Sequence, residues 1–260
     1  MGDADALTSL LRRDRAVAAA ALAGVVLIAW VYLFFGMGME VPEVGAMLAP
    51  AMTEHWSRGY AAMMLLMWVI MMAAMMLPSA APMILLHATL ARRRRELGGV
   101  APATGVFVLG YVAIWALFSA LATALQWALS EAAQMSSAMS LTSRLAAASI
   151  LIAAGVYQWT PLKQSCLRHC RTPLDFVLGH WREGTWGGFA MGVRHGGFCL
   201  GCCWVLMLLL FVGGVMNTLW IAGLTLFVLV EKTAPWGHWG SQVAGGVLVL
   251  WGFSALLSMT

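Results

Sequence analysis

The sequence predicts an all-α protein, a polytopic transmembrane bundle of about seven helices, with six as the alternative. Of its 260 residues, 62% are hydrophobic and only 10% are charged, whereas soluble proteins carry roughly a quarter charged residues. The mean hydropathy is +0.83. Several apolar runs approach the ~20 residues that a helix needs to cross a bilayer. Little of the chain remains for a soluble domain.

We divide the chain into residues 1–58, with an N-terminal tail, a first transmembrane helix and an external loop, and residues 59–260, a metal-binding membrane helical domain. Three arginines, Arg12, Arg13 and Arg15, precede an apolar run over 16–35. This run is too long for the apolar region of a signal peptide, so we expect a retained helix. Arginines near the end of a span favour the cytoplasmic side, which places the N-terminus there.

The second span, about 60–86, is rich in methionine. Met63, Met67, Met71 and Met75 recur every four residues and would form a slanted stripe along the helix. Thioethers suit Cu(I), so the stripe predicts a metal pathway. The alternative is packing, because methionine fills irregular helix interfaces. Two prolines, Pro78 and Pro82, predict a kink or an end to this helix.

The positions of basic residues then predict the orientation of the remaining spans. The run Arg92–Arg95 predicts a cytoplasmic turn, as do the basic residues of the loop 160–185. Further apolar segments are expected to cross at 104–129, 145–159, from near 187 or 198 to 215, at 218–230 and at 242–257. The segment 218–230 is short for a full crossing.

The fifth span carries His195, Cys199, Cys202 and Cys203. At 100° per residue, and with His195 at zero, the cysteines lie near about 40°, −20° and 80°, on one helical face. Four such side chains on one stripe favour a metal site, because polar ligands are costly to bury in lipid without compensation. Gly197 and Gly201 offer a packing interpretation instead, since small residues spaced by four allow close helix contact.

A second group, Cys166, His169 and Cys170, lies in the loop predicted on the cytoplasmic side. The predicted topology brings it to the same leaflet as the first group. Five cysteines are an odd number, which argues against a disulfide framework. Thiolates and imidazoles select Cu(I) or Zn(II). We expect copper(I), which the methionine stripe favours, with zinc as the alternative.

Several motifs resemble a bacterial family of predicted metal-binding integral membrane proteins, sometimes labelled copper chaperones. They are A-M-M-L-P-S-A at 74–80, T-P-L-K-Q-S-C-L-R-H-C at 160–170, M-G-V-R-H-G-G-F-C-L-G-C-C-W at 191–204, G-G-V-M-N at 213–217 and E-K at 231–232. The resemblance covers the chain from about residue 60. It implies a multi-pass protein of the bacterial inner membrane, with metal ligands at Cys166, His169, Cys170, His195, Cys199, Cys202 and Cys203, and it supplies no reaction.

The leading hypothesis is a non-enzymatic membrane protein that binds a soft metal for delivery, storage or transport. Its expected partners are the lipid bilayer and a protein that donates or accepts the metal, and no feature favours nucleic acid. Two alternatives stay open, a membrane thiol-disulfide oxidoreductase and a structural subunit of a membrane complex. We find no nucleophile and base pair for a hydrolase and no phosphate-binding loop.

Overall fold

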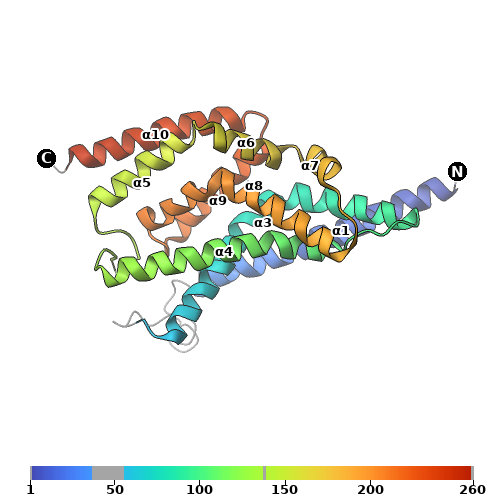
Figure 1. Ribbon diagram of the computed structural model, residues 1–260, viewed down its shortest axis with the longest axis horizontal. Helices are drawn as coiled ribbons and strands as arrows, with labels where there is room; N and C mark the ends of the chain where they lie inside the picture. The colour runs from blue at the N-terminus through green and yellow to red at the C-terminus, as the bar shows by residue number, and fades with distance from the viewer. Residues whose placement is uncertain (1, 37–55, 137–138, 259–260) are drawn as a thin grey trace.

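The computed structural model describes residues 2–36, 56–136 and 139–258, and nine α-helices account for most of them (Figure 1). In chain order they are α1 (Gly2–Gly36), α3 (Arg58–Glu96), α4 (Thr104–Glu131), α5 (Arg144–Tyr157), α6 (Pro161–Arg171), α7 (Pro173–His180), α8 (Gly184–Gly213), α9 (Thr218–Thr233) and α10 (Gly237–Leu257). The predicted all-α bundle is confirmed. The predicted external loop lies largely outside the described residues.

Each of the seven predicted apolar segments forms a helix, but fewer are long enough to cross a membrane. Within the described residues, five helices have the length and hydropathy of a span: α1, α3, α4, α8 and α10. The count rises to six if α5 and α6, bent by 64° at their junction, make one broken span. The break falls there because Thr160 caps α6 and Pro161 occupies its first turn. With only 16 residues, α9 is shorter than a span.

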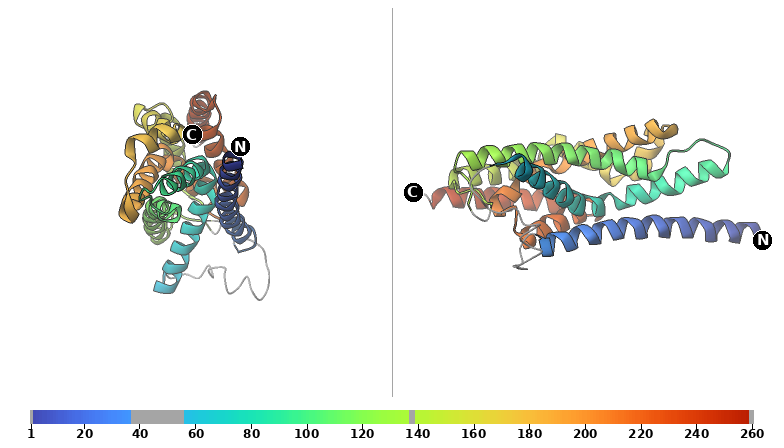
Figure 2. Two further views of the ribbon diagram at one scale, coloured as in Figure 1. Left: turned by 90° about the vertical axis from the view of Figure 1, so that its right-hand side faces the viewer. Right: turned by 90° about the horizontal axis from the view of Figure 1, so that it is seen from below.

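Helix α3 continues through Pro78 and Pro82 rather than ending at them. Figure 2 shows that it bends between its two halves. Each proline removes one hydrogen bond from the helix ladder, which explains the change of direction. The bend brings the second half of α3 alongside α4 and α9, while α1 packs along its outside.

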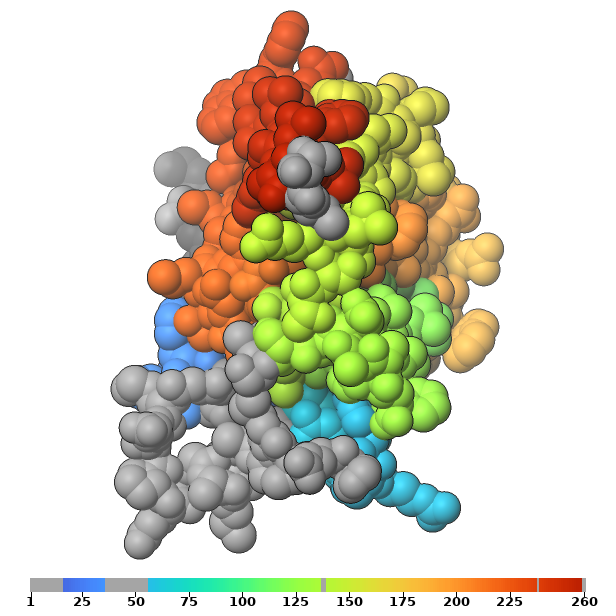
Figure 3. All heavy atoms as spheres, turned by 90° about the vertical axis from the view of Figure 1, so that its left-hand side faces the viewer, coloured from blue at the N-terminus to red at the C-terminus, as the bar shows by residue number. Residues whose placement is uncertain are grey.

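The two ends of the bundle differ in charge. The N-terminus and the α3–α4 connection lie at one end, whereas α6 lies near the middle of the long axis (Figure 1). Because Arg92–Arg95 lie there, we call it the arginine end. The C-terminal part of α10 and the segment that joins α4 to α5 lie at the opposite end, which Figure 3 views directly. The N-terminus and the predicted turn after α3 therefore lie at the same end of the molecule.

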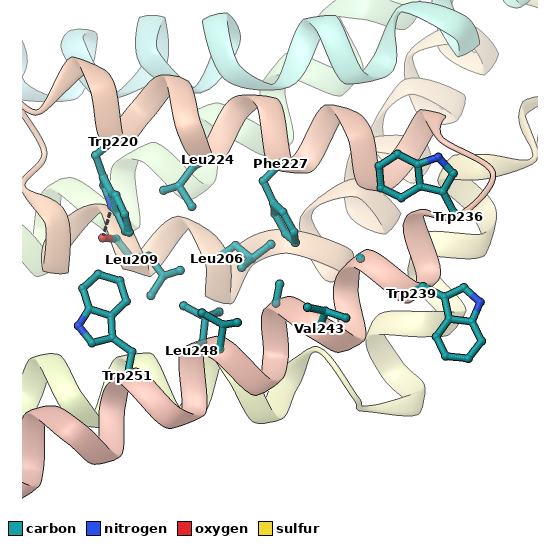
Figure 4. A pocket seen from close by; sticks show the side chains of 13 residues that line it. Leu206, Leu209, Trp220, Leu224, Phe227, Trp236, Trp239, Val243, Leu248 and Trp251 are labelled. Atoms are coloured by element: carbon teal, nitrogen blue, oxygen red, sulfur yellow. Dashed lines mark hydrogen bonds between the residues drawn. The ribbon is translucent and has the colours of Figure 1, made fainter.

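An apolar groove runs between α8, α9 and α10 (Figure 4). Its volume is about 610 Å³, and its walls include Leu206, Phe227 and Val243. Trp220 donates from its indole N–H to the Leu209 carbonyl at 2.8 Å, which satisfies its polar atom within this apolar wall. Such a lining suits contact with the hydrocarbon chains of a bilayer.

Glycines set the closest helix contact in the bundle, between α4 and α8. A Cβ atom added to Gly192 of α8 would overlap the Phe107 carbonyl of α4, and one added to Gly110 would overlap the Phe189 carbonyl. The contact between α4 and α8 thus involves Gly110 and Gly192 rather than the expected pair, Gly197 and Gly201. At Gly197 an added Cβ has nothing within 4 Å, and at Gly201 it faces the sulfur of Cys166.

We predict that Gly192→Ala destabilises the bundle by about 1–3 kcal/mol, because backbone cannot yield as a side chain can. The measurement is thermal unfolding of the purified protein in detergent. The matched control is Gly197→Ala, on the same helix with open space at the added methyl. Equal midpoints for the two variants would contradict the packing described here.

Candidate metal site

Helix α8 buries the four polar groups of its central segment. His195, Cys199, Cys202 and Cys203 are each at most 2% exposed. The helical spacing predicts this common face, and the structure turns that face towards the bundle interior. Both Cys202 and Cys203 donate from sulfur to the Cys199 carbonyl at 3.0 Å, so their thiol groups cluster over one turn of the helix.

Helix α6 brings the second group of cysteines to the first. The Cys170 side chain lies close enough to the thiols of Cys199 and Cys202 to interact with them. Cys166 packs against the open side of Gly201, where an added Cβ would lie 2.7 Å from its sulfur. Two stretches about 30 residues apart in the sequence therefore place their thiols together, and all five cysteines are free.

The two histidines differ in their surroundings. The His195 ring stacks near Tyr111, with ring centres 5.7 Å apart, and its Nδ1 atom is buried without a hydrogen-bond partner. A buried polar nitrogen without a partner is costly, so it is available to a ligand. His169 is half-buried, stacks on Phe198 at 4.1 Å, and its Nδ1 lies 2.9 Å from the Ser165 carbonyl.

The lysine of the E-K motif, which was not among the predicted site residues, lies among the thiols. Lys232, in the last turn of α9, is buried and donates to the Cys199 sulfur at 2.9 Å and to the Ser79 hydroxyl at 3.2 Å. The Tyr111 hydroxyl lies 3.1 Å from the same sulfur and 3.2 Å from the Met76 carbonyl. Helices α3, α4, α8 and α9 thus converge on Cys199.

The neighbouring residue, Glu231, faces away from Lys232. It forms an ion pair with Lys163 of α6 at 2.6 Å, with both side chains almost fully buried, and it accepts a hydrogen bond from Ser241 of α10. Adjacent residues at the end of α9 therefore contact different helices. Glu231 pairs with α6, which carries Cys166 and Cys170, while Lys232 contacts Cys199 of α8.

Because Glu231 pairs with Lys163, Lys232 has the sulfur of Cys199 rather than the adjacent carboxylate as its neighbour. Within the described ranges, the ion pairs involve other residues, and Lys232 interacts electrostatically with the thiols of Cys170, Cys199, Cys202 and Cys203. A buried cation is costly unless an anion compensates it. A nearby lysine in turn favours the thiolate form of cysteine, which is the form that binds metals. The lysine is therefore placed to stabilise a thiolate on Cys199.

The methionines of α3 form a buried line whose register differs from the expected stripe. Met67, Met71 and Met75 are buried, whereas Met63 is 38% exposed. Each step of four residues rotates a side chain by about 40° around the helix, which carries the first position outwards. The buried methionines of this helix are Met64, Met67, Met71, Met72, Met75, Met76 and Met83.

The donor chemistry fits a soft metal, although the side chains are not arranged around one point as bound ligands would be. Among the described residues, no three His, Cys, Asp or Glu side chains form a ready metal-holding group. Thiols, an imidazole and thioethers nevertheless share one buried region, and such ligands favour Cu(I) over hard cations. Binding would require thiol side chains to rotate away from the Cys199 carbonyl.

The ion pair between Lys163 and Glu231 supports a stability prediction. We expect Lys163→Met to cost about 3–5 kcal/mol, because it leaves a buried carboxylate without its cation. The double variant Lys163→Met, Glu231→Gln should be more stable than this single variant, since it removes both charges. Thermal unfolding in detergent measures both. A single variant as stable as the unmodified protein would show that the pair does not hold α6.

One comparison with known proteins identifies a family. A family model described as PpoB2, copper chaperone, matches residues 65–255, which run from α3 to α10 and include all five cysteines and Lys232. No curated protein and no solved structure matches the chain. The match covers most of the chain and agrees with the resemblance that its motifs carry. The chain therefore belongs to the PpoB2 copper chaperone family.

Proposed function

We propose that this protein is a multi-pass membrane protein that binds Cu(I) as cargo through the thiols of α6 and α8, for delivery to or from a partner protein. The observation that carries the proposal is the packing of Cys166 of α6 against Gly201 of α8, between Cys199 and Cys202 in the chain, which brings the two cysteine motifs together. Family membership supports a copper-related role. The imidazole of His195 would serve as an additional ligand.

We further propose that the arginine end faces the cytoplasm of a bacterial cell. The supporting argument is charge, because arginines concentrate on the cytoplasmic side of inner-membrane proteins. Lys232 lies in the last turn of α9, before the turn into α10. The thiol cluster would then be reached from the cytoplasmic leaflet, where free thiols stay reduced. A cytoplasmic copper donor or acceptor is the expected protein partner.

Metal analysis tests this proposal. We expect the full-length protein, purified without oxygen, to bind Cu(I), with copper–sulfur coordination in its X-ray absorption spectrum. The double variant Cys199→Ser, Cys202→Ser should lose this copper, while Gly197→Ala on the same helix should retain it. Copper content at background level, equal in the unmodified protein and the double variant, would falsify the proposal.

The positions of the thiols also predict how a thiol–disulfide oxidoreductase would behave differently from a metal-binding protein. Cys170 lies near Cys199 and Cys202, so exchange with a disulfide of a partner protein would leave a disulfide between α6 and α8 and two thiols on the partner. Alkylation of intact cells followed by mass spectrometry distinguishes the two functions. Thiols that stay fully alkylatable in every growth condition support metal binding, and a cycling disulfide without bound copper supports thiol–disulfide exchange.

The contact between Lys232 and Cys199 leads to a second prediction. A hydrogen bond to a charged group contributes about 1.5–3 kcal/mol. We therefore expect Lys232→Met to weaken Cu(I) binding by roughly 10- to 100-fold, because the thiolates lose a compensating cation. Competition with a chromophoric Cu(I) chelator measures the affinity.

The matched control is Thr233→Val, on the next residue of α9. Thr233 is exposed, and its hydroxyl donates only to the Leu229 carbonyl of its own helix. Its replacement should leave the copper affinity unchanged. If Lys232→Met binds copper as tightly as this control, the lysine has no part in stabilising the bound state.

A further inference from the structure

A second cluster of sulfur atoms lies at the opposite end of the bundle from the arginines. Gln126 of α4 directs its side-chain nitrogen to two thioethers, Met139 at 3.2 Å and Met64 at 3.5 Å. All three residues are buried. Because both sulfurs lie within hydrogen-bond distance of one nitrogen atom, they are close neighbours although they come from α3 and from the segment between α4 and α5.

The orientation of the Gln126 amide is set by a third residue. The indole N–H of Trp68 donates to its carbonyl oxygen at 2.7 Å. Since an indole nitrogen can only donate, it fixes the oxygen on its own side and the nitrogen towards the sulfurs. Trp68 is itself buried and stacks near Phe211 of α8, with ring centres 5.3 Å apart. The amide therefore acts as a rigid support for the two thioethers.

The backbone holds Met139 in an unfavourable conformation. Its φ angle is 53°, in the left-handed region that a methionine rarely adopts. Its carbonyl accepts from Val215, and nearby Leu141 donates to the Phe211 carbonyl at the end of α8. Backbone strain of this kind persists only where the surroundings enforce it, and it gathers at binding sites. The hydrogen bond from Val215 holds the Met139 backbone, and the Gln126 amide contacts the sulfurs of both Met139 and Met64.

Two fixed thioethers in an apolar interior have a defined chemistry. Each sulfur has two lone pairs, and the amide hydrogen bond engages one, so the other remains for a ligand. Thioethers are soft donors without charge, which favours Cu(I) and its relative Ag(I) over Zn(II) or Mg(II). They also hold the metal more weakly than thiolates, which suits a site that must release its ion.

The buried methionines of α3 connect this cluster with the thiols. Met64 and Met76 lie about 18 Å apart along the helix, and buried methionines occupy the turns between them. The Met76 carbonyl accepts from the Tyr111 hydroxyl, which contacts Cys199. Buried methionines therefore occupy successive turns of α3 between the amide-supported pair and the turn that contacts Tyr111.

We propose that Met64 and Met139 form a second binding site, for a soft monovalent cation, at the end of the bundle opposite the arginines. The site deepens the proposed function, since it provides a place where a copper ion leaves or enters the protein on the far side of the membrane. Gln126 and Trp68 are positioning residues. The proposal does not depend on the thiols, so the two sites can fail separately.

Silver binding provides the first test. We expect the full-length protein, titrated calorimetrically with Ag(I), to bind one equivalent fewer in the double variant Met64→Leu, Met139→Leu. Leucine preserves volume and is tolerated in packed cores, so loss of the ion without loss of the fold separates ligation from packing. The matched control is Met63→Leu, Met135→Leu, which replaces two neighbouring methionines outside the proposed site.

The second test needs no change at Met64 or Met139. Selenomethionine-labelled protein loaded with Cu(I) should show copper–selenium scattering in its X-ray absorption spectrum. That signal should persist in Cys199→Ser, Cys202→Ser, where the thiol copper is lost. Absence of copper–selenium scattering at full copper loading overturns this proposal and leaves the thiol site standing. A different outcome overturns the proposed function instead. In that outcome copper–selenium scattering persists, and the thiol variants bind as much copper as the unmodified protein.

Discussion

The fold of the thiol cluster depends on two buried charges at the end of α9. Glu231 pairs with Lys163 of α6 and Lys232 contacts Cys199 of α8, so one helix end fixes both cysteine-bearing helices. Buried charges are expensive unless they are paired, which makes this arrangement specific as well as costly. A helix displaced by one residue would leave a charge without its partner.

Packing around these charges explains why the thiols meet. The glycine contact of α8 with α4 lets the two backbones approach closely and brings Tyr111 within reach of Cys199. The break at Pro161 turns α6 across the side of α8, where a continuous α5 would have carried Cys166 and Cys170 away. The cluster is therefore a product of a broken helix, a close helix contact and a pair of buried charges.

The two sulfur clusters use different means of support. At the thiol cluster, a cation stands beside groups that can become anions, which favours strong binding of a positively charged metal. At the pair of Met64 and Met139, a neutral amide orients neutral thioethers. The two clusters therefore differ in donor strength, with thiols on α6 and α8 and thioethers on α3 and in the segment between α4 and α5.

The sequence by itself determined the all-α class, the position of the apolar helices and the shared face of His195, Cys199, Cys202 and Cys203, because hydropathy and the helical period act locally. It also supplied the two cysteine motifs. Only the tertiary structure decided that Lys232 lies among the thiols, that Glu231 turns to Lys163, and that Met64 rather than Met63 faces the interior. Those outcomes depend on which helices pack together and how each is rotated, and no local pattern of residues encodes a contact between distant helices.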